Sequence, residues 1–162
     1  MAFLEVKILL SCVFLIYTNV EAAPSPKVRQ DPYRPLGHIE ASSLREVSYE
    51  KGQEITDWDM ENGYSLLEGG MIYTDGHLKV PEDGVYYIYA QLYFHSTGRV
   101  RVFKNYEEPL TMANYPDVSE GSKYAGGAFR LEAGDTISLV AATSVKLYMA
   151  PYHSYFGAFL LQ

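Results

Sequence analysis

Short apolar runs broken by turn residues follow one another along this chain from about residue 34 onwards, a pattern typical of β-strands. The longest run is GVYYIYAQLYF at 84–94, which has no internal glycine, no proline and no charge. Side chains alternate across a strand, so this run has two faces. One carries Tyr86, Ile88, Ala90, Leu92 and Phe94, and the other carries Val85, Tyr87, Tyr89, Gln91 and Tyr93.

The first face of this strand is a core face. The second presents three tyrosine rings and a glutamine. Their ring area is too large to leave in water, and their hydroxyl and amide groups need hydrogen-bond partners. We therefore predict that the second face meets another chain.

The apolar runs predict about ten strands and no helix, at 35–41, 65–67, 71–73, 77–80, 84–94, 100–104, 110–114, 123–131, 136–142 and 155–161. Asp75-Gly76 is a two-residue hairpin signal, and Gly126-Gly127 predicts either a β-bulge or a close backbone approach. We expect 42–63 to be a polar surface loop pinned by one buried indole, that of Trp58. Strands at this spacing predict an all-β, two-sheet sandwich of the jelly-roll type.

Composition limits the number of domains and excludes one class of partner. With 162 residues, of which 48% are hydrophobic, the chain is long enough for one well-packed domain and short for two. We place that domain at 34–162. The net charge is −7, with acidic and basic residues interspersed, which argues against nucleic acid as a partner because phosphates require a basic surface.

The first 22 residues have the pattern of a cleaved signal peptide. Lys7 precedes the apolar run ILLSCVFLIY, and Val20-Glu21-Ala22 offers small residues to signal peptidase. Ten helical residues rise about 15 Å against a hydrocarbon core of about 30 Å, so an uncleaved signal anchor that holds the protein on a membrane is the less favoured alternative. We expect a secreted, extracellular protein in which the proline-rich residues 23–33 form a linker.

Catalytic chemistry finds little support in the sequence. The four histidines are scattered without metal-ligand spacing, and the one cysteine, Cys12, lies within the predicted signal peptide. Nucleophile-elbow, P-loop and dinucleotide-binding motifs are absent from the sequence. We expect a protein that is not an enzyme, with no catalytic residue, metal, cofactor or small-molecule substrate. His38, on the first predicted strand, is expected to be a hydrogen-bonded histidine near the interface rather than a ligand.

Four motifs, in order along the chain, resemble the tumour necrosis factor ligand family. The segment Leu78-x-Val80-x-x-x-Gly84-Val85-Tyr86-Tyr87-Ile88-x-x-Gln91 matches the signature strand of that family. RPLGHIEA at 34–41 is similar to its first strand, GGAFRLEAGDTISL at 126–139 to its paired F and G strands, and YFGAFLL at 155–161 to its last strand. The resemblance covers residues 34–162. Compact loops and the form of the last strand lean toward the ectodysplasin and TWEAK-like branch.

The resemblance implies a jelly-roll cytokine that forms a homotrimer around a three-fold axis and binds cysteine-rich receptors of the tumour necrosis factor receptor family between its protomers. In the family, aromatic residues from three strands line this axis, and the matching positions here are Tyr89, Tyr124 and Tyr155. The alternation argument and the resemblance together give the predicted trimer interface: Tyr87, Tyr89, Gln91, Tyr124, Phe129, Tyr155, Phe159 and Leu161.

The resemblance also implies where a receptor binds. In such ligands the contacts come mainly from the loop after strand D, the segment after the first strand, and the loop between strands C and D. The matching tip of the first of these is Tyr106, flanked by Asn105 and Glu107. An exposed aromatic residue on a tight acidic turn is suited to anchor an interface. Segment 42–56 is a weaker candidate, and the loops at 95–98 and 115–122 are too short for the family's contacts to be carried over.

Two other classes of binding protein stay open at this point. The globular C1q domain shares the jelly roll, the trimer and some glycine motifs, but C1q-like chains usually close with Phe-x-Gly-Phe where this chain has YFGAF at 155–159. They also often carry a collagen-like Gly-X-Y stem, and no such repeat precedes residue 34. A jelly-roll carbohydrate-binding module is a more distant alternative.

Overall fold

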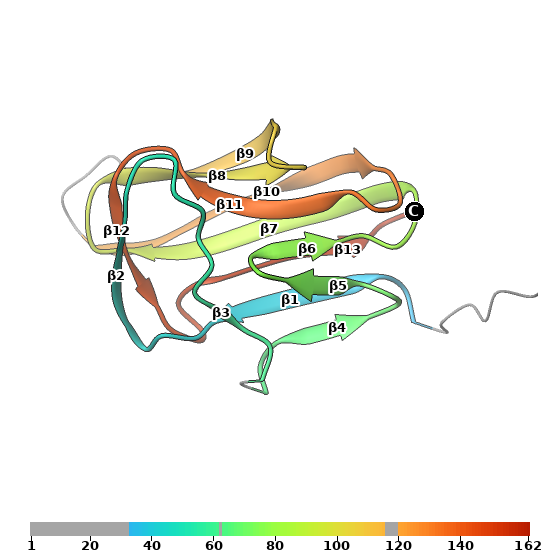
Figure 1. Ribbon diagram of the computed structural model, residues 1–162, viewed down its shortest axis with the longest axis horizontal. Helices are drawn as coiled ribbons and strands as arrows, with labels where there is room; N and C mark the ends of the chain where they lie inside the picture. The colour runs from blue at the N-terminus through green and yellow to red at the C-terminus, as the bar shows by residue number, and fades with distance from the viewer. Residues whose placement is uncertain (1–32, 62, 116–119) are drawn as a thin grey trace, which may run out of the picture. The chain divides into compact units, whose positions relative to one another are not determined.

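The computed structural model describes residues 33–61, 63–115 and 120–162, which form thirteen strands in two antiparallel sheets (Figure 1). The predicted signal peptide at 1–22 and all but the last residue of the predicted linker lie outside the described residues. Across the part of the chain that is described, no helix is long and apolar enough to cross a bilayer.

The larger sheet contains eight strands in the order β2-β12-β7-β13-β1-β3, with β10 also paired to β7 and β4 to β1. These strands are β1 (Leu36–Ala41), β2 (Arg45–Tyr49), β3 (Trp58–Asp59), β4 (Leu66–Glu68), β7 (Gly84–Phe94), β10 (Gly121–Leu131), β12 (Val145–Met149) and β13 (Tyr155–Leu160). Strand β7 pairs with β10 on one side and with β13 and β12 on the other, so it lies in the middle of this sheet.

The smaller sheet contains five strands in the order β5-β6-β11-β8-β9. They are β5 (Ile72–Thr74), β6 (His77–Lys79), β8 (Gly98–Lys104), β9 (Glu108–Tyr115) and β11 (Thr136–Ala141). The long strands of both sheets run in similar directions (Figure 1), as in an aligned sandwich. This two-sheet, all-β architecture confirms the predicted fold class.

The core lies between the sheets and is organised around β7, as its sequence pattern predicts. Burial alternates strictly along the strand, and the side chains on its inner face, from Tyr86 to Phe94, are at most 1% exposed. The Tyr86 hydroxyl donates to the Glu82 carbonyl at 2.9 Å, so this buried phenol is satisfied. Burying a large apolar side chain such as Ile88, Leu92 or Phe94 contributes about 1.5–3 kcal/mol, so β7 is a substantial source of hydrophobic stabilisation.

The expected bulge at Gly126-Gly127 is wrong. Strand β10 pairs with β7 in one unbroken register, from Gly121 opposite Phe94 to Leu131 opposite Gly84. The glycines instead allow a close approach, because a Cβ at Gly126 would lie 2.8 Å from the Tyr124 hydroxyl oxygen and 3.1 Å from the Ile88 carbonyl oxygen. The second of the two expectations for this pair, close approach, is the one that holds.

The polar segment 42–63 is more ordered than expected. It contains β2, which pairs with β12, and β3, which pairs with β1. Of the residues in β2 only Tyr49 is fully buried, so this edge strand shows no apolar alternation that a sequence pattern could reveal. The expected buried indole is present: Trp58 is 7% exposed and donates its Nε1–H to the Ile55 carbonyl at 2.6 Å.

Candidate functional site

The register of the eight-stranded sheet gathers one set of side chains on its outward surface. Residues directly opposite each other in an antiparallel pair point to the same side. Gln91, Tyr89 and Tyr87 of β7 therefore share a surface with residues of β13, β10 and β1 that pair along them. We call this surface the tyrosine face, made of Leu36, His38, Glu40, Tyr87, Tyr89, Gln91, Tyr124, Gly126, Ala128, Tyr155, Gly157 and Phe159.

Tyr89 is the centre of the tyrosine face. Its ring stacks on His38 with centroids 5.9 Å apart and lies 6.3 and 6.4 Å from the rings of Tyr155 and Phe159. The residues on either side of it across the sheet are Gly126 and Gly157, and a Cβ at Gly157 would collide with the Tyr89 phenol. Glycine at position 157 therefore leaves room for this large ring beside β13.

Two phenols of the tyrosine face, those of Tyr89 and Tyr124, have raised pKa values and stay protonated at physiological pH. Burial, and to a lesser degree a hydrogen bond to Tyr87, raises the pKa of Tyr124 to about 12; its hydroxyl lies 3.2 Å from that of Tyr87. Burial, followed by the nearby phenols of Tyr155 and Tyr124, raises the pKa of Tyr89 as well. An uncharged aromatic surface of this kind is suited to contact with another protein surface.

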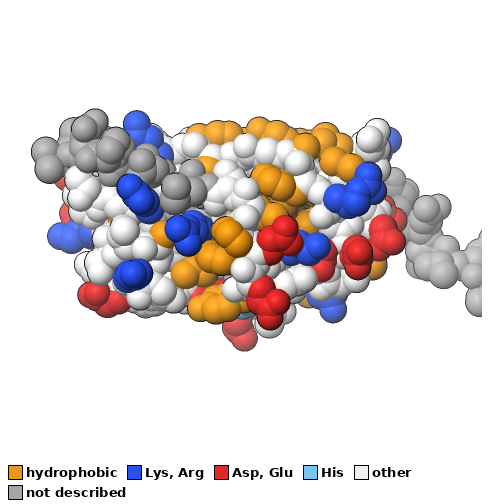
Figure 2. Space-filling view, turned by 90° about the horizontal axis from the view of Figure 1, so that it is seen from above, with side chains coloured by type: hydrophobic (Ala, Val, Ile, Leu, Met, Phe, Trp, Pro, Cys, Tyr) orange, Lys and Arg blue, Asp and Glu red, His pale blue; other side chains and the backbone are white. Residues whose placement is uncertain are grey.

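In Figure 2, hydrophobic side chains form a band along the upper edge of the view and further patches in its middle, and acidic and basic side chains are interspersed between these patches. Tyr124 is 54% exposed although it sits in an aromatic cluster. A contiguous apolar surface rimmed by charge is the usual mark of a protein interface.

A polar network lies within the tyrosine face and is satisfied internally. A carboxylate oxygen only accepts, so the His38 Nε2–H donates to the Glu40 Oε1 at 3.0 Å. In the tautomer that carries its proton on Nε2, the ring accepts the Tyr89 hydroxyl at Nδ1, 2.7 Å away. Glu40 is 6% exposed. His38 is thus the hydrogen-bonded histidine that the sequence led us to expect, whereas the buried Glu40 was not anticipated.

Six of the eight residues predicted for the interface lie together on the tyrosine face: Tyr87, Tyr89, Gln91, Tyr124, Tyr155 and Phe159. Leu161 is the residue after the end of β13 and is 41% exposed. The placement of Phe129 on this face is wrong. Without a bulge it lies opposite Tyr86, so it points to the inner side and packs against the core.

The turn predicted to contact a receptor joins β8 to β9. Asn105 and Tyr106 both have positive φ, of 51° and 62°, as a type I′ turn requires. The Tyr106 ring is 50% exposed and stacks on Phe103 with centroids 6.2 Å apart. Glu107 is exposed beside it. Tyr106 and Glu107 are therefore open to a partner at the tip of a rigid hairpin.

Asn105, the third residue predicted to contact a receptor, is exposed and also forms bonds within its own domain. Its Nδ2–H donates to Asp135 at 2.7 Å, and its Oδ1 accepts the Thr136 amide at 2.9 Å. Both bonds tie the β8–β9 turn to the turn before β11. These bonds give Asn105 a part in the architecture of the turn, and its contact with a receptor stays a prediction.

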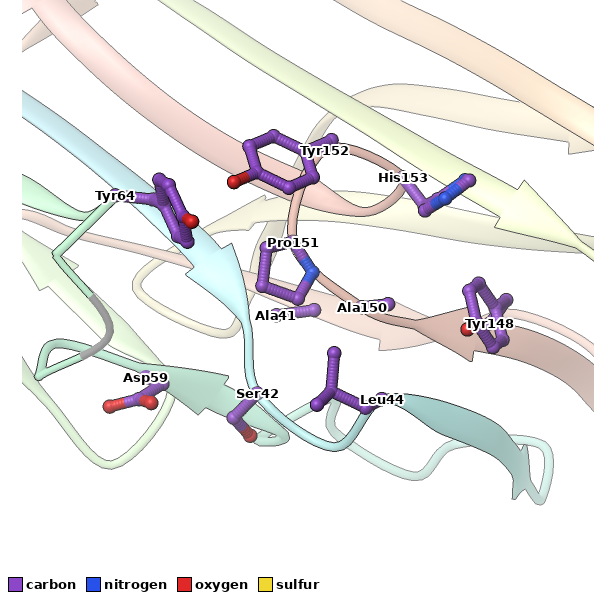
Figure 3. A pocket seen from close by; sticks show the side chains of 10 residues that line it. All are labelled: Ala41, Ser42, Leu44, Asp59, Tyr64, Tyr148, Ala150, Pro151, Tyr152 and His153. Carbon is purple, nitrogen blue, oxygen red and sulfur yellow. The ribbon is translucent and has the colours of Figure 1, made fainter.

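A hollow of about 480 Å³ lies at the C-terminal end of β1 (Figure 3). Its lining comes from β1 and the segment after it, from the segment around β3, and from the connection between β12 and β13: Ala41, Ser42, Leu44, Asp59, Tyr64, Tyr148, Ala150, Pro151, Tyr152 and His153. Tyr64 and Tyr152 meet edge to face at one end, with centroids 4.7 Å apart, and are 50% and 63% exposed. We call this the Tyr64–Tyr152 hollow.

Few features of the sequence indicate this hollow. Tyr64 lies between the predicted polar loop at 42–63 and the predicted strand at 65–67, and Tyr152 is a turn residue with a φ of 68°. Neither belongs to an alternating run, so neither periodicity nor a motif could place it. Only the pairing of β1 with β13 and β3 brings the three contributing segments together.

The described part of the chain offers no arrangement for a metal ion. Within residues 33–61, 63–115 and 120–162, no three His, Cys, Asp or Glu side chains are grouped as metal ligands. His77 instead lies 3.0 Å from Glu54, and His95 lies 2.8 Å from Glu120. The surface features that the described residues do present are the tyrosine face, the Tyr106 turn and the Tyr64–Tyr152 hollow.

Comparison with known sequences points to one family. The sequence profile of the TNF (Tumour Necrosis Factor) family matches residues 56–120. Mouse tumor necrosis factor ligand superfamily member 15 is 27% identical, over 93% of this chain and 72% of that protein. Human lymphotoxin-alpha is 27% identical over 82% and 77%, and rat tumor necrosis factor 27% over 79% and 62%. The similarity is spread over several members, so it does not single out a branch.

Solved structures show the same fold. Eiger TNF from S. frugiperda superposes with a TM-score of 0.66 at 20% identity, covering 80% of this chain and 94% of that one. Murine APRIL at pH 8.5 gives a TM-score of 0.61 at 22% identity, covering 80% and 100%. These neighbours confirm the jelly-roll sandwich, and neither the C1q-like nor the carbohydrate-binding alternative is favoured by the comparisons.

Proposed function

The chain carries a tumour necrosis factor homology domain, and from that premise we propose that it is a secreted cytokine that forms a homotrimer and clusters cysteine-rich receptors of the tumour necrosis factor receptor family. It acts by binding rather than by catalysis. The signal peptide predicted at 1–22 supports release from the cell.

The tyrosine face is the observation that carries this proposal. It joins four strands in a surface of neutral rings around Tyr89, with Tyr124 left 54% exposed in the single chain. Such an aromatic surface is removed from water only when a partner covers it. A second and third copy of the same chain supply one, because a cyclic trimer repeats a single interface around its axis. Tyr89, Tyr124 and Tyr155 then lie near that axis.

Two exposed aromatic sites supply the receptor contacts in this proposal. Tyr106 stands at the tip of the β8–β9 hairpin, and the Tyr64–Tyr152 hollow offers two further rings beside a concave surface. Aromatic anchors that fill or line pockets dominate the binding energy of protein interfaces. One trimer would present three copies of each site and so hold up to three receptor chains, with avidity multiplying a modest affinity at each.

The proposal is tested with receptor ectodomains. We expect the purified protein to bind at least one member of a panel of cysteine-rich receptor ectodomains immobilised on a sensor surface. Tyr106→Ala and Tyr64→Ala should each weaken that binding by about tenfold or more, mainly through faster dissociation. Ile72→Ala, which removes an exposed hydrophobic side chain of β5, is the matched control and should bind like the wild type.

All four proteins should have the same mass in solution, which separates receptor contact from assembly. Binding to no ectodomain of the panel would contradict the proposed function. Wild-type affinity in both tyrosine variants would contradict the assignment of the receptor sites while leaving the cytokine proposal in place.

A further inference from the structure

Among the described residues, Glu40 is the one buried acidic residue, with 6% of its surface exposed. A buried carboxylate is costly unless charge partners and hydrogen bonds surround it. Its Oε1 accepts from His38 Nε2 at 3.0 Å, and its Oε2 accepts from the Tyr152 backbone amide at 2.9 Å. The two oxygens therefore bind two different parts of the molecule.

The first oxygen of Glu40 faces the tyrosine face. The His38 ring that it holds accepts the Tyr89 hydroxyl at 2.7 Å and lies 5.2 Å from the Tyr155 ring centroid. Fixing one nitrogen of a histidine fixes the tautomer and the orientation of the ring. The carboxylate thereby sets the position of the Tyr89 phenol at the centre of the proposed trimer interface.

The second oxygen of Glu40 holds the backbone of Tyr152, which lines the Tyr64–Tyr152 hollow. Tyr152 has a φ of 68°, a conformation that is unfavourable for a non-glycine residue and persists only where its surroundings hold it. The bond from its amide to the carboxylate is one such constraint. The Glu40 backbone amide also donates to Ser65 Oγ at 2.9 Å, next to Tyr64. Both tyrosines of the hollow are therefore held, directly or through a neighbour, by the same residue.

We propose that Glu40 is a positioning residue that couples assembly at the tyrosine face to the shape of the Tyr64–Tyr152 hollow. This inference rests on the proposed function, since it assumes that the tyrosine face is a trimer interface. When a neighbouring protomer covers the face, His38 is locked and the carboxylate is held toward the Tyr152 amide. The single chain already forms these bonds; with the face open to water, His38 and the carboxylate exchange them more often for bonds to water, so the turn at 150–154 opens more often.

Hydrogen exchange measures this coupling directly, because amide protection reports the free energy of local opening. Exchange is followed by mass spectrometry in the purified full-length protein above and below the concentration at which it dissociates. We expect the amides of 150–154 in the wild type to exchange about tenfold faster, or more, once the trimer dissociates. Residues of β11 serve as the internal reference for global opening.

The Glu40→Gln variant should exchange quickly at 150–154 at both concentrations, since the amide side chain cannot be an acceptor toward both His38 and Tyr152 with the strength of a carboxylate. Protection in β11 should stay unchanged, which a general loss of stability would not allow. His38→Phe keeps a ring on the tyrosine face and removes the donor to Glu40, so it should give the same local loss even if Glu40→Gln folds poorly. Glu132→Gln, at an exposed carboxylate, is the matched control and should behave like the wild type.

Three outcomes distinguish the possibilities. Fast exchange at 150–154 in both variants, with assembly-dependent protection in the wild type, supports the coupling. A wild type that assembles but shows the same protection before and after dissociation, or variants with wild-type protection, overturns the coupling alone. A wild type that never assembles at any concentration overturns the proposed function and the coupling with it.

Discussion

At the scale of single residues, the structure assigns roles through hydrogen bonds that residue type alone does not reveal. Asn105 and Tyr106 are exposed neighbours with similar backbone conformations, yet the Asn105 side chain is hydrogen-bonded within its own domain whereas the Tyr106 ring stacks on Phe103. The difference lies in Asp135, which accepts from Asn105 Nδ2 at 2.7 Å and from the Glu132 amide at 2.8 Å and lies 3.0 Å from Lys104 Nζ. This carboxylate joins two turns into one rigid end of the sandwich.

The hydrogen bonds and the ion pair of Asp135 make the free energy of unfolding depend on pH in a defined way. Partial burial raises the pKa of this carboxyl, but the bonds from Glu132, Asn105 and Lys104 outweigh it and hold the pKa below its usual 3.8. A lowered folded-state pKa means that the contribution is present above about pH 4 and is lost as pH falls below that value. Asp135→Asn should therefore flatten the loss of unfolding free energy between pH 4 and pH 2.

Urea denaturation at pH 7, 4 and 2.5, at one protein concentration, measures this effect. At pH 7 the variant should be less stable by about 1 kcal/mol, because charge-assisted bonds become neutral ones. Asp75→Asn, in an exposed hairpin turn whose positive φ suits asparagine, is the matched control and should keep the acid dependence of the wild type. If Asp135→Asn lost as much unfolding free energy between pH 4 and pH 2.5 as the wild type, the stabilising role of the Asp135 carboxylate would be contradicted.

At the scale of elements, the register of β13 between β1 and β7 decides what the tyrosine face contains. Gly157 lies opposite His38 on one side and Tyr89 on the other. A Cβ at this position would collide with the Gly37 carbonyl oxygen, which is backbone and cannot turn away, and with the Tyr89 phenol. The glycine is thus required by the close approach of three strands rather than by its backbone conformation.

Gly157→Ala should lower the free energy of unfolding by about 1–3 kcal/mol, since overpacking a sheet forces backbone shifts. Gly127→Ala is the matched comparison, because its added Cβ would meet only the Phe129 ring, at 3.0 Å, and a side chain can turn away. Thermal and urea denaturation of both variants measure the difference. Equal losses in the two proteins would show that the close approach at Gly157 is not what limits that position.

The sequence predicted some elements well because their physics is local. The bounds of β7 agree with the prediction, since its eleven residues alternate without interruption between two glycine-containing turns. Strand β2 was missed because its residues are mostly exposed and charged, so that pairing with β12 rather than an apolar stripe holds it in place. Phe129 was misplaced because one assumed bulge reverses the face of every residue after it.

The same limit applies to the candidate sites. Tyr89, Tyr124 and Tyr155 could be grouped from alternation and a family resemblance. Glu40 could not, because its partner Tyr152 lies 112 residues away and because glutamate is rarely buried unless paired. Pairing of that range is set by the assembled sheet, so no local pattern records it.

At the scale of the whole molecule, the proposed function depends on what covers the tyrosine face. The sandwich closes its core between the two sheets, yet one sheet leaves a connected set of aromatic rings on its outside. In the proposed trimer this surface is buried around a three-fold axis, and the exposed sites at Tyr106 and the Tyr64–Tyr152 hollow remain on the outside. Both the clustering of receptors and the coupling through Glu40 therefore require that the chain forms a trimer.

Sedimentation equilibrium over a dilution series tests that claim most directly, with the wild type and Tyr89→Asp compared side by side. The wild type should have three times the mass of a single chain. Tyr89→Asp should sediment as a folded monomer at the same concentrations, because it would bury three uncompensated carboxylates near the axis. A wild type that stays monomeric and folded, or a Tyr89→Asp variant that keeps the trimer mass, would contradict the account.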